Sequence, residues 1–292
     1  MTGTSNPQSV ALQRRYRPAP LRFDLKLRDR GRPWVMGVLN ATPDSFSDGG
    51  RWLTCDQAVR HAVDMAQGGA DIIDVGGEST RPGSFPVSPE DEIARSVPLI
   101  RRLKSELDIA VSIDTSKPEV MQAAVDAGAE MINDVFALQQ PGALEMAAML
   151  NVPVCLMHMH GTPRSMQAAP NYEDVVSDVR SFLVNRVSAC RAAGMPEDVI
   201  VLDPGFGFGK TFLHNVELFR AIPLLCELGF PLLVGVSRKS MLGEITGRKV
   251  HERMPASIAA AVLAAQLGAA IIRVHDVSET VDALQTAAAL SA

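Results

Sequence analysis

The chain has 292 residues and a net charge of −5, and 47% of its residues are apolar. It is long enough for one large domain or two small ones, and this apolar fraction can build an extensive core. The mild acidity, with no basic block beyond residue 32, argues against nucleic-acid binding. Four widely spaced cysteines without a CxxC pair indicate reduced thiols in a cytoplasmic protein, rather than disulfides or a zinc site: Cys55, Cys155, Cys190 and Cys226.

The N-terminal segment differs in composition from the rest. Residues 1–20 contain arginines, no acids and no apolar core of a secretory signal, so we expect a flexible tail. Alternating apolar and polar residues between Leu21 and Leu27 predict a short strand or hairpin. The longest apolar stretch, 255–272, is mostly alanine and favours a buried helix followed by a strand over a membrane span. We therefore expect a single domain over residues 21–292, with no membrane partner.

From residue 34 onward, short apolar runs alternate with longer helical patterns. Thr54 with Gln57, and Ser88 before Pro89, indicate helix starts, and glycines indicate helix ends: Gly128, Gly194, Gly229 and Gly268. Eight such units in about 250 residues predict a (β/α)8 TIM barrel, with a doubly wound open sheet as the alternative. No second domain boundary is evident, which favours the barrel. The expected strands are 34–40, 71–77, 110–115, 131–135, 153–159, 199–205, 231–237 and 271–277.

A polar side chain recurs near the end of nearly every expected strand. An unpaired buried polar group costs roughly 1–3 kcal/mol. A single one of these residues could be a core residue whose hydrogen bonds are satisfied, but a whole series favours a function. In a barrel these ends converge on the face where active sites form. The series comprises Asn40, Asp74, Asp114, Asn133, Asp203, Arg273 and His275.

The residue types at these ends indicate a ligand with two chemically different ends. Carboxylates and an amide can accept N–H bonds from an amidine-like heterocycle, while cations suit an anionic group. The cations are Lys239, Arg273 and Arg81. Polar residues 41–50, which end in Gly-Gly, and residues 77–83 are expected to close over the site as lids.

Two further segments resemble well-known motifs. Residues 203–211 end like a Walker A loop, but Pro204 takes the place of its first glycine and has no N–H, which argues against nucleotide binding. The remaining interpretation of residues 203–211 is a ligand-facing loop with an aromatic residue. His158 and His160 have the HxH spacing of a metal pair, yet no other cluster completes a site, and we assign no metal ligand there.

Eight strings, taken in order, resemble the dihydropteroate synthases of the folate pathway: NATPDSFSDGG, DVGGESTRPG, SIDTSKPEV, INDV, LMHMHG, DPGFGFGK, GVSRKS and RVHDV. The resemblance covers residues 34–277 and includes every expected strand end. It implies a TIM barrel, usually a homodimer, that condenses 6-hydroxymethyl-7,8-dihydropterin diphosphate with 4-aminobenzoate. The products are 7,8-dihydropteroate and diphosphate, and Mg²⁺ assists. Sulfonamides, which mimic aminobenzoate, would compete with it.

The resemblance also implies a role for each matching residue. Asn40 would bind Mg²⁺ and diphosphate. The pterin would be recognised by Asp114, Asn133, Asp203 and Lys239. Arg273 and His275 would bind diphosphate, with Arg273 also packing on the pterin, and the catalytic set would be Lys239, Arg273 and His275. The aminobenzoate pocket would be lined by Phe46, Thr80, Arg81, Pro82, Phe208 and Ser240.

No Ser–His–acid order or reactive cysteine motif is present, so the amine of aminobenzoate is itself the expected nucleophile. One alternative is a methyltransferase built on the same pterin-binding barrel, which would not need residues that bind diphosphate. The other is a non-catalytic paralogue. Loss of Thr80 and Arg81, or of Arg238 and Lys239, would have indicated the paralogue, but all four are present.

Overall fold

The computed structural model describes residues 32–41, 51–79, 83–161, 166 and 170–291. The tail expected over 1–20 and the strand or hairpin expected before residue 32 lie outside these residues. So do most of the first expected lid and the centre of the second. The boundaries of the single domain predicted for residues 21–292 stay a prediction.

Eight parallel strands form one sheet in the order β6-β5-β4-β3-β2-β1-β8-β7. A parallel bridge between Leu202 and Leu232 joins the two ends of this order, and the N–H of Leu202 donates to the carbonyl of Pro231 at 2.9 Å. The sheet is therefore closed, so the (β/α)8 barrel is confirmed and the open-sheet alternative is wrong. The strands are β1 (Trp34–Asn40), β2 (Ile72–Gly76), β3 (Ala110–Asp114), β4 (Met131–Asp134), β5 (Val154–Met157), β6 (Ile200–Asp203), β7 (Leu233–Val234) and β8 (Ile271–Val274).

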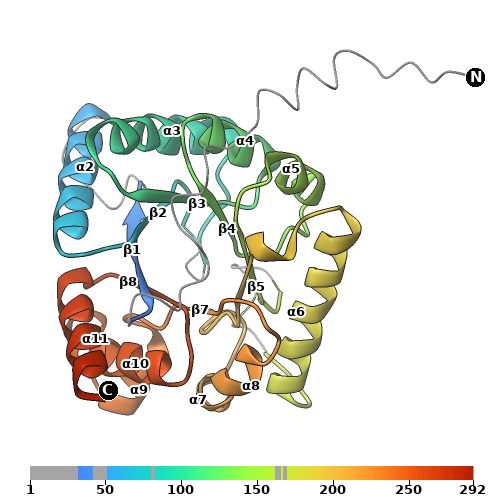
Figure 1. Ribbon diagram of the computed structural model, residues 1–292, viewed down its shortest axis with the longest axis vertical. Helices are drawn as coiled ribbons and strands as arrows, with labels where there is room; N and C mark the ends of the chain where they lie inside the picture. Colours follow the sequence, from blue (N-terminus) through green and yellow to red (C-terminus); the bar gives the residue numbers. More distant parts are fainter. Residues whose placement is uncertain (1–31, 42–50, 80–82, 162–165, 167–169, 292) are drawn as a thin grey trace, which may run out of the picture.

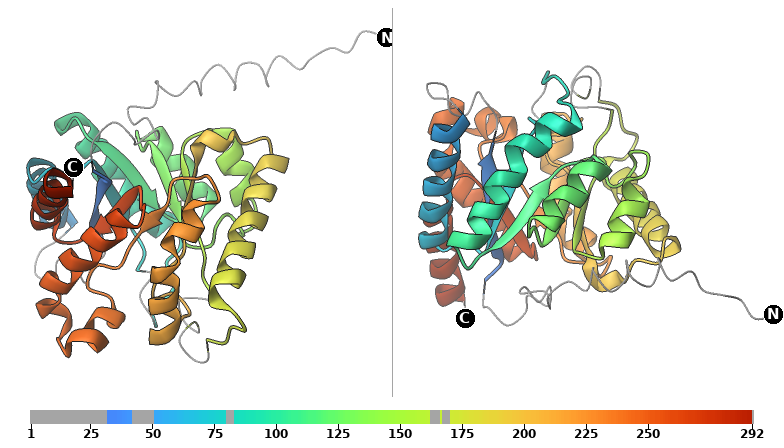
Figure 2. Two further views of the ribbon diagram at one scale, coloured as in Figure 1. Left: turned by 60° about the horizontal axis from the view of Figure 1, so that its bottom comes forward. Right: turned by 90° about the horizontal axis from the view of Figure 1, so that it is seen from above.

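The helices surround the strands on the outside (Figures 1 and 2). They are α2 (Arg51–Gln67), α3 (Pro89–Glu106), α4 (Pro118–Asp126), α5 (Ala143–Leu150), α6 (Val175–Ala192), α7 (Phe212–Arg220), α8 (Ile222–Cys226), α9 (Ser240–Thr246), α10 (Met254–Gln266) and α11 (Val277–Ser291), with short 3-10 helices at Glu197–Val199 and Val250–Glu252.

Helix starts agree only in part with the sequence prediction. Ser88 caps α3 and accepts the N–H of Asp91 at 3.1 Å, with Pro89 as the first helical residue. The start predicted at Thr54 is wrong, because α2 already begins at Arg51. The residues before Thr54 continue the helix toward its N-terminus, so Thr54 lies in the first turn and is not the cap. All four predicted glycine stops have a positive φ, which is typical of helix C-termini: Gly128, Gly194, Gly229 and Gly268.

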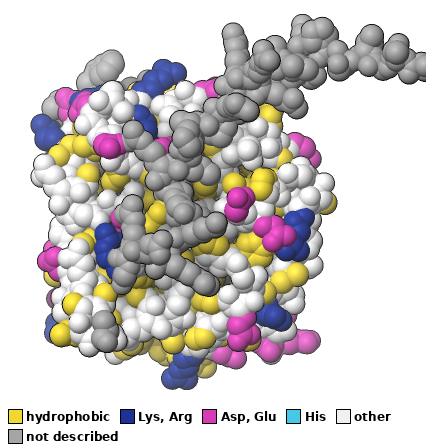
Figure 3. Space-filling model, in the orientation of Figure 1, with side chains coloured by type: hydrophobic (Ala, Val, Ile, Leu, Met, Phe, Trp, Pro, Cys, Tyr) yellow, Lys and Arg dark blue, Asp and Glu magenta, His cyan; other side chains and the backbone are white. Residues whose placement is uncertain are grey.

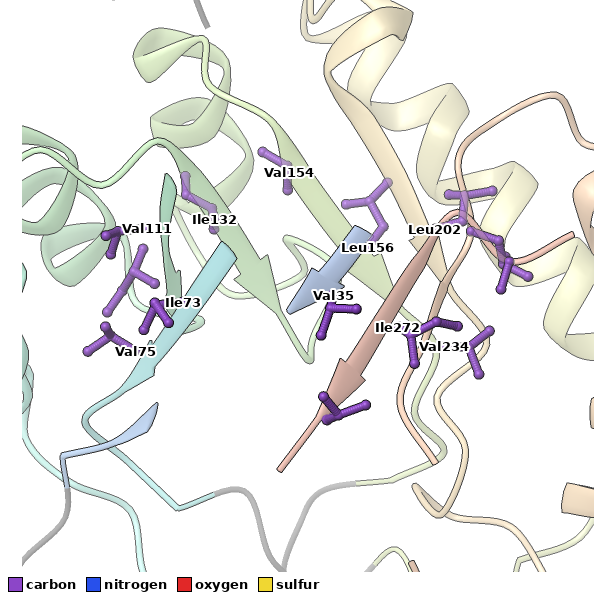
Figure 4. Close-up of a cluster of buried hydrophobic side chains, with 14 of the residues drawn as sticks. Val35, Ile73, Val75, Val111, Ile132, Val154, Leu156, Leu202, Val234 and Ile272 are labelled. Carbon is purple, nitrogen blue, oxygen red and sulfur yellow. The ribbon is translucent and has the colours of Figure 1, made fainter. Parts of the chain in front are cut away.

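Alternation along each strand separates two apolar layers. The layer between strands and helices is shown in part in Figure 4 and includes Val35, Ile73, Val75, Val111, Ile132, Val154, Leu156, Leu202, Val234 and Ile272. The layer inside the barrel comprises Trp34, Met36, Ile72, Ala110, Met131, Cys155, Val201, Leu233 and Ile271. Two residues further along several of these strands, the inward side chains become polar: Asp74, Ser112, Asn133, Asp203 and Arg273. The carboxyl end of the barrel thus has a polar interior above an apolar plug.

The apolar stretch at 255–272 forms a helix followed by a strand, as predicted. That stretch forms most of α10 and the start of β8. Across the ranges that the structure covers, no helix has the length and hydropathy needed to cross a membrane. On the described part of the face in Figure 3, basic and acidic side chains are scattered rather than gathered into a block of one sign.

Candidate active site

A buried network joins four strands at the carboxyl end of the barrel. Asp74 on β2 accepts Nε of Arg273 at 2.7 Å and Nδ2 of Asn133 at 3.0 Å. The hydroxyl of Ser112 on β3 also donates to Asp74. Nη2 of Arg273 donates to Oδ2 of Asp114 at 2.9 Å, so this arginine is shared by two carboxylates. Side chains from β2, β3, β4 and β8 are therefore held in one arrangement.

Asp114, at the end of β3, has one oxygen paired and one free. Its Oδ1 is buried, and no donor in the described part of the chain reaches it. Burial raises the pKa of Asp114; the charge of Asp74 adds to the increase and that of Arg273 opposes it. A buried acceptor without a donor costs roughly 1–3 kcal/mol, and such exceptions in folded proteins often mark functional positions. Oδ1 of Asp114 is well suited to accept an N–H from a ligand.

Arg273 links this network to the other half of the barrel. Burial by itself would lower the pKa of Arg273, but Asp74 and Asp114 outweigh burial and raise the pKa, so the guanidinium stays charged. The same positive charge acts on Asp203 and on Lys239. The polar ends of β2, β3, β6 and β8, together with the loop after β7, therefore share one electrostatic environment.

The segments after β6 and β7 supply a second group of side chains. Asp203 accepts the N–H of Gly205 at 2.7 Å, and burial raises the pKa of Asp203 although Lys239 opposes the increase. Nζ of Lys239 donates to the carbonyl of Phe206 and lies 4.6 Å from the ring centroid of Phe208, a cation–π distance. Burial lowers the pKa of Lys239 to about 8 against the opposing effect of Asp203.

His275 lies two residues after Arg273, beyond the end of β8. Its backbone N–H donates to the hydroxyl of Ser237 at 3.2 Å, and its Nδ1 lies 3.0 Å from the same oxygen. The contact through Nδ1 fixes the orientation of the imidazole ring, so that Nε2 lies on the side of the ring away from Ser237.

Lys210 makes the loop after β6 resemble a Walker A motif. Its side chain is buried and stabilises that loop. Its Nζ lies 2.9 Å from Nδ1 of His158 and donates to the carbonyls of Gly205 at 2.9 Å and Phe208 at 3.1 Å. Burial lowers the pKa of His158 to about 3, with Lys210 adding to the decrease, so the imidazole is neutral and accepts. The ring of His160 packs instead near Tyr172, with centroids 5.5 Å apart.

The remaining predicted site residues lie close to this cluster or outside the described chain. Asn40 is half-buried at the end of β1, and a Cβ at Gly76 would lie 3.8 Å from Oδ1 of Asn40 and 3.7 Å from Cβ of Asp114. Ser240 is exposed and begins α9 directly after Lys239. Four predicted residues of the aminobenzoate pocket lie outside the described residues: Phe46, Thr80, Arg81 and Pro82.

Asp74 and Ser112 belong to the network although the sequence analysis did not assign them to the site. Asp74 appears there only as a polar strand end, and Ser112 not at all. Each lies two residues before another inward-facing position, Gly76 and Asp114 respectively, so strand alternation was the signal that could have found them.

Arg238 has a positive φ of 58° and an ion pair to Asp276, with Nε 3.0 Å from Oδ2.

Comparison with known proteins agrees with this geometry. A model of the pterin binding enzymes matches residues 36–275. A dihydropteroate synthase of Escherichia coli strain K12 is 49% identical over 88% of this chain and 91% of its own. A Xanthomonas albilineans dihydropteroate synthase solved with 4-aminobenzoic acid has a TM-score of 0.85 and 53% identity, over 89% of this chain and 94% of its own. Another structure from that organism, in complex with 7,8-dihydropteroate, has a TM-score of 0.81 and 46% identity, over 92% and 95%. The chain belongs to the family of pterin binding enzymes.

Proposed function

We infer that this chain catalyses the dihydropteroate synthase reaction: it condenses 6-hydroxymethyl-7,8-dihydropterin diphosphate with 4-aminobenzoate to give 7,8-dihydropteroate and diphosphate. The observation that carries the inference is the buried Oδ1 of Asp114, which no donor among the described residues reaches, within a network of fixed acceptors and cations. A pteridine has the N–H groups such acceptors need. The E. coli relative carries the same activity in its name, and the X. albilineans structures hold one substrate and the product.

We propose that the pterin lies against the strand ends of the barrel. In this proposal Asp114, Asn133 and Asp203 accept its N–H groups, while Lys239 donates to its acceptor atoms. Hydrogen bonds to charged groups contribute roughly 1.5–3 kcal/mol each, and a heterocycle without the matching N–H pattern would leave these buried acceptors unpaired. The burial of Asp114 and Asp203 supports the assignment, because water then competes little for them.

The diphosphate is proposed to meet Arg273 and His275. Arg273 stays charged between two carboxylates, and its side chain is about a quarter exposed, at 24%. His275 adds a second donor close by. Together they would stabilise the charge that develops on the departing diphosphate.

Mg²⁺ is a further part of the proposal. Asn40 presents a neutral amide oxygen beside Gly76, where a side chain is absent, and no cluster of acidic residues is needed. Mg²⁺ normally keeps several waters and binds through substrate phosphates plus one or two protein oxygens, so this donor fits a metal held mainly by diphosphate. The ion would neutralise negative charge on the leaving group.

The amine of aminobenzoate is the proposed nucleophile. Its nitrogen forms a bond to the pterin methylene carbon, the carbon–oxygen bond to diphosphate breaks with its electron pair leaving on diphosphate, and the nitrogen loses one proton. Phe208 and Ser240 would line the aminobenzoate pocket with Phe46, Thr80, Arg81 and Pro82. The loops that carry these residues would exclude water, which otherwise competes with the amine.

We also propose a cytoplasmic homodimer. The cysteines of the described chain are all free thiols, which fits a reducing compartment. Large apolar side chains are exposed on neighbouring helices α7, α9 and α10: Leu213, Ile245 and Leu263. Apolar side chains exposed on an outer face are candidates for protein–protein contacts.

The direct test is an assay of dihydropteroate and diphosphate formation from the two purified substrates with Mg²⁺. Stoichiometric formation of both products is expected, and sulfonamides should compete with aminobenzoate but not with the pterin. Methyl transfer to a corrinoid acceptor without release of diphosphate would indicate the methyltransferase instead. Pterin binding without turnover would indicate the non-catalytic paralogue.

A further inference from the structure

The side chain of Asp74 is completely buried, with an exposed fraction of 0%. Its carboxylate accepts bonds from β3, β4 and β8 through Ser112, Asn133 and Arg273. A carboxylate buried to this degree is tolerated only when it is paired and hydrogen-bonded. Asp74 therefore does not touch a ligand, but two of its donors, Asn133 and Arg273, belong to the proposed substrate site.

The bond to Asn133 determines which way that amide faces. A carboxylate can only accept hydrogen bonds, so the branch of Asn133 that lies 3.0 Å from Oδ2 of Asp74 must be the nitrogen. The amide oxygen is then on the opposite branch, away from Asp74. Asn133 can therefore offer an acceptor to a ligand, and a group at position 74 that donated a hydrogen bond would favour the reverse orientation.

The bond to Arg273 fixes a guanidinium in the same way. Nε of Arg273 is held by Asp74 at 2.7 Å, while Nη2 is held by Asp114 at 2.9 Å. Two charge-assisted bonds to different strands set the plane of the guanidinium. When a ligand engages Asp114, Asp74 still holds Arg273 in place, because it is buried beyond the reach of that ligand.

We propose that Asp74 is a positioning residue for pterin specificity: it turns the amide oxygen of Asn133 toward the N–H groups of the heterocycle and holds the guanidinium of Arg273 in place. The proposal rests on the proposed function, since it concerns the same site. Asp74 acts through its neighbours, so its loss affects the pterin and leaves the aminobenzoate pocket largely unchanged.

The test compares Asp74→Asn with the matched control Asp71→Asn. Asp71 lies at the other end of β2 and also pairs with an arginine, Arg32, with Nη1 2.6 Å from Oδ2. For Asp74→Asn we expect at least tenfold weaker binding of 6-hydroxymethylpterin by calorimetry and at least a tenfold higher KM for the pterin diphosphate. The KM for 4-aminobenzoate should change less than threefold. For Asp71→Asn all three values should stay within threefold.

A second variant removes the acceptor altogether. Asn133 and Arg273 both donate to Oδ2 of Asp74, and in Asp74→Asn the amide oxygen can take the place of Oδ2, whereas Asp74→Leu offers no acceptor. We expect Asp74→Leu to bind 6-hydroxymethylpterin at least threefold more weakly than Asp74→Asn. If Asp74→Asn does not fold, Asp74→Leu is compared with wild type, and at least tenfold weaker binding is expected.

The outcomes separate the two proposals. A wild-type protein that forms no dihydropteroate contradicts the proposed function. An active wild type with Asp74→Asn binding the pterin within threefold contradicts only the role of Asp74. So does equal loss for both substrates, or a folded Asp74→Leu variant that binds the pterin as tightly as Asp74→Asn.

Discussion

At the scale of single residues, Asp203 shows how neighbouring groups fix the position of a site carboxyl and shift its pKa. It is the last residue of β6 and is buried, and the N–H of Gly205 holds its Oδ1 at 2.7 Å. Lys239 opposes the pKa increase that burial causes. The sequence predicted Asp203 as a site residue from its place at a strand end. The hydrogen bond to Gly205 could not be predicted, because it depends on the turn that follows the strand.

Asp203→Asn should weaken the binding of 6-hydroxymethylpterin at least tenfold, or about 1.4 kcal/mol, because a charge-assisted bond becomes a neutral one. The amide oxygen can still accept from Gly205, so the thermal midpoint should change little. Calorimetric titration measures the affinity and circular dichroism the midpoint. An affinity within threefold of wild type would contradict the assignment of Asp203 to the pterin.

His158 should make stability depend on pH in the mildly acidic range. Its pKa is about 3 in the folded protein against 6.5 in the unfolded chain, so the unfolded chain binds more protons between these values. Stability from this group is therefore complete above pH 6.5 and is lost as the pH falls toward 3.

His158→Gln keeps an acceptor for Lys210 but does not titrate. Between pH 6.5 and pH 5, the free energy of unfolding of wild type should fall by about 2 kcal/mol relative to this variant, at about 1.4 kcal/mol per pH unit. Urea denaturation at several pH values measures the difference. Parallel pH curves for the two proteins would show that His158 is not the group responsible.

At the scale of elements, the loop between β6 and α7 shows what strand periodicity does not reveal. The residue pattern of 203–211 predicts a ligand-facing loop with an aromatic residue, and Phe208 does lie near Lys239. The pattern does not predict that Lys210 folds back on the carbonyls of Gly205 and Phe208 and on His158. That contact joins β5 to the loop after β6, and only the assembled sheet brings these segments together.

Gly205→Ala should disrupt this loop. Gly205 has a φ of +70°, and a Cβ there would lie 1.9 Å from the carbonyl oxygen of His158. The left-handed conformation and the clash together should cost at least about 2 kcal/mol of unfolding free energy and weaken pterin binding through Asp203.

Gly229→Ala is the matched control for Gly205→Ala. Its φ is +85°, and nothing lies within 4 Å of an added Cβ. Only the conformational term remains, and it should cost roughly 1–2 kcal/mol without any effect on pterin affinity. Equal losses in the two variants, measured by denaturant unfolding, would contradict the role of the contact between Gly205 and His158.

At the scale of the whole molecule, the closed barrel separates the site from the surface that we propose for dimerisation. The polar network lies at the carboxyl ends of the strands, whereas Leu263 on α10 is 52% exposed on the outer ring. Met149 on α5 is similarly exposed, at 50%. Helix α5 lies across the barrel from α10 (Figure 1). The two side chains therefore allow exposed apolar residues on two different faces of the barrel to be compared.

Leu263→Glu should dissociate the proposed homodimer, because a charge buried in an apolar contact is costly. Sedimentation velocity should give a dimer for wild type and a monomer, or at least a tenfold weaker dimer, for the variant. Met149→Glu should remain dimeric. A monomeric wild type, or a variant that dimerises as wild type does, would contradict the assignment of this face.

The sequence by itself determined the alternation of strands and helices, the parallel barrel and the polar strand ends, because periodicity and glycine or proline positions are local properties. It also carried the motifs that indicate a pterin binding enzyme. Only the tertiary structure decided which polar groups pair. Arg273 and Asp74 are 199 positions apart, yet Nε and Oδ2 lie 2.7 Å from each other once β8 closes beside β1. Such pairing depends on barrel closure and register, and these are set by the packing of all eight strands together.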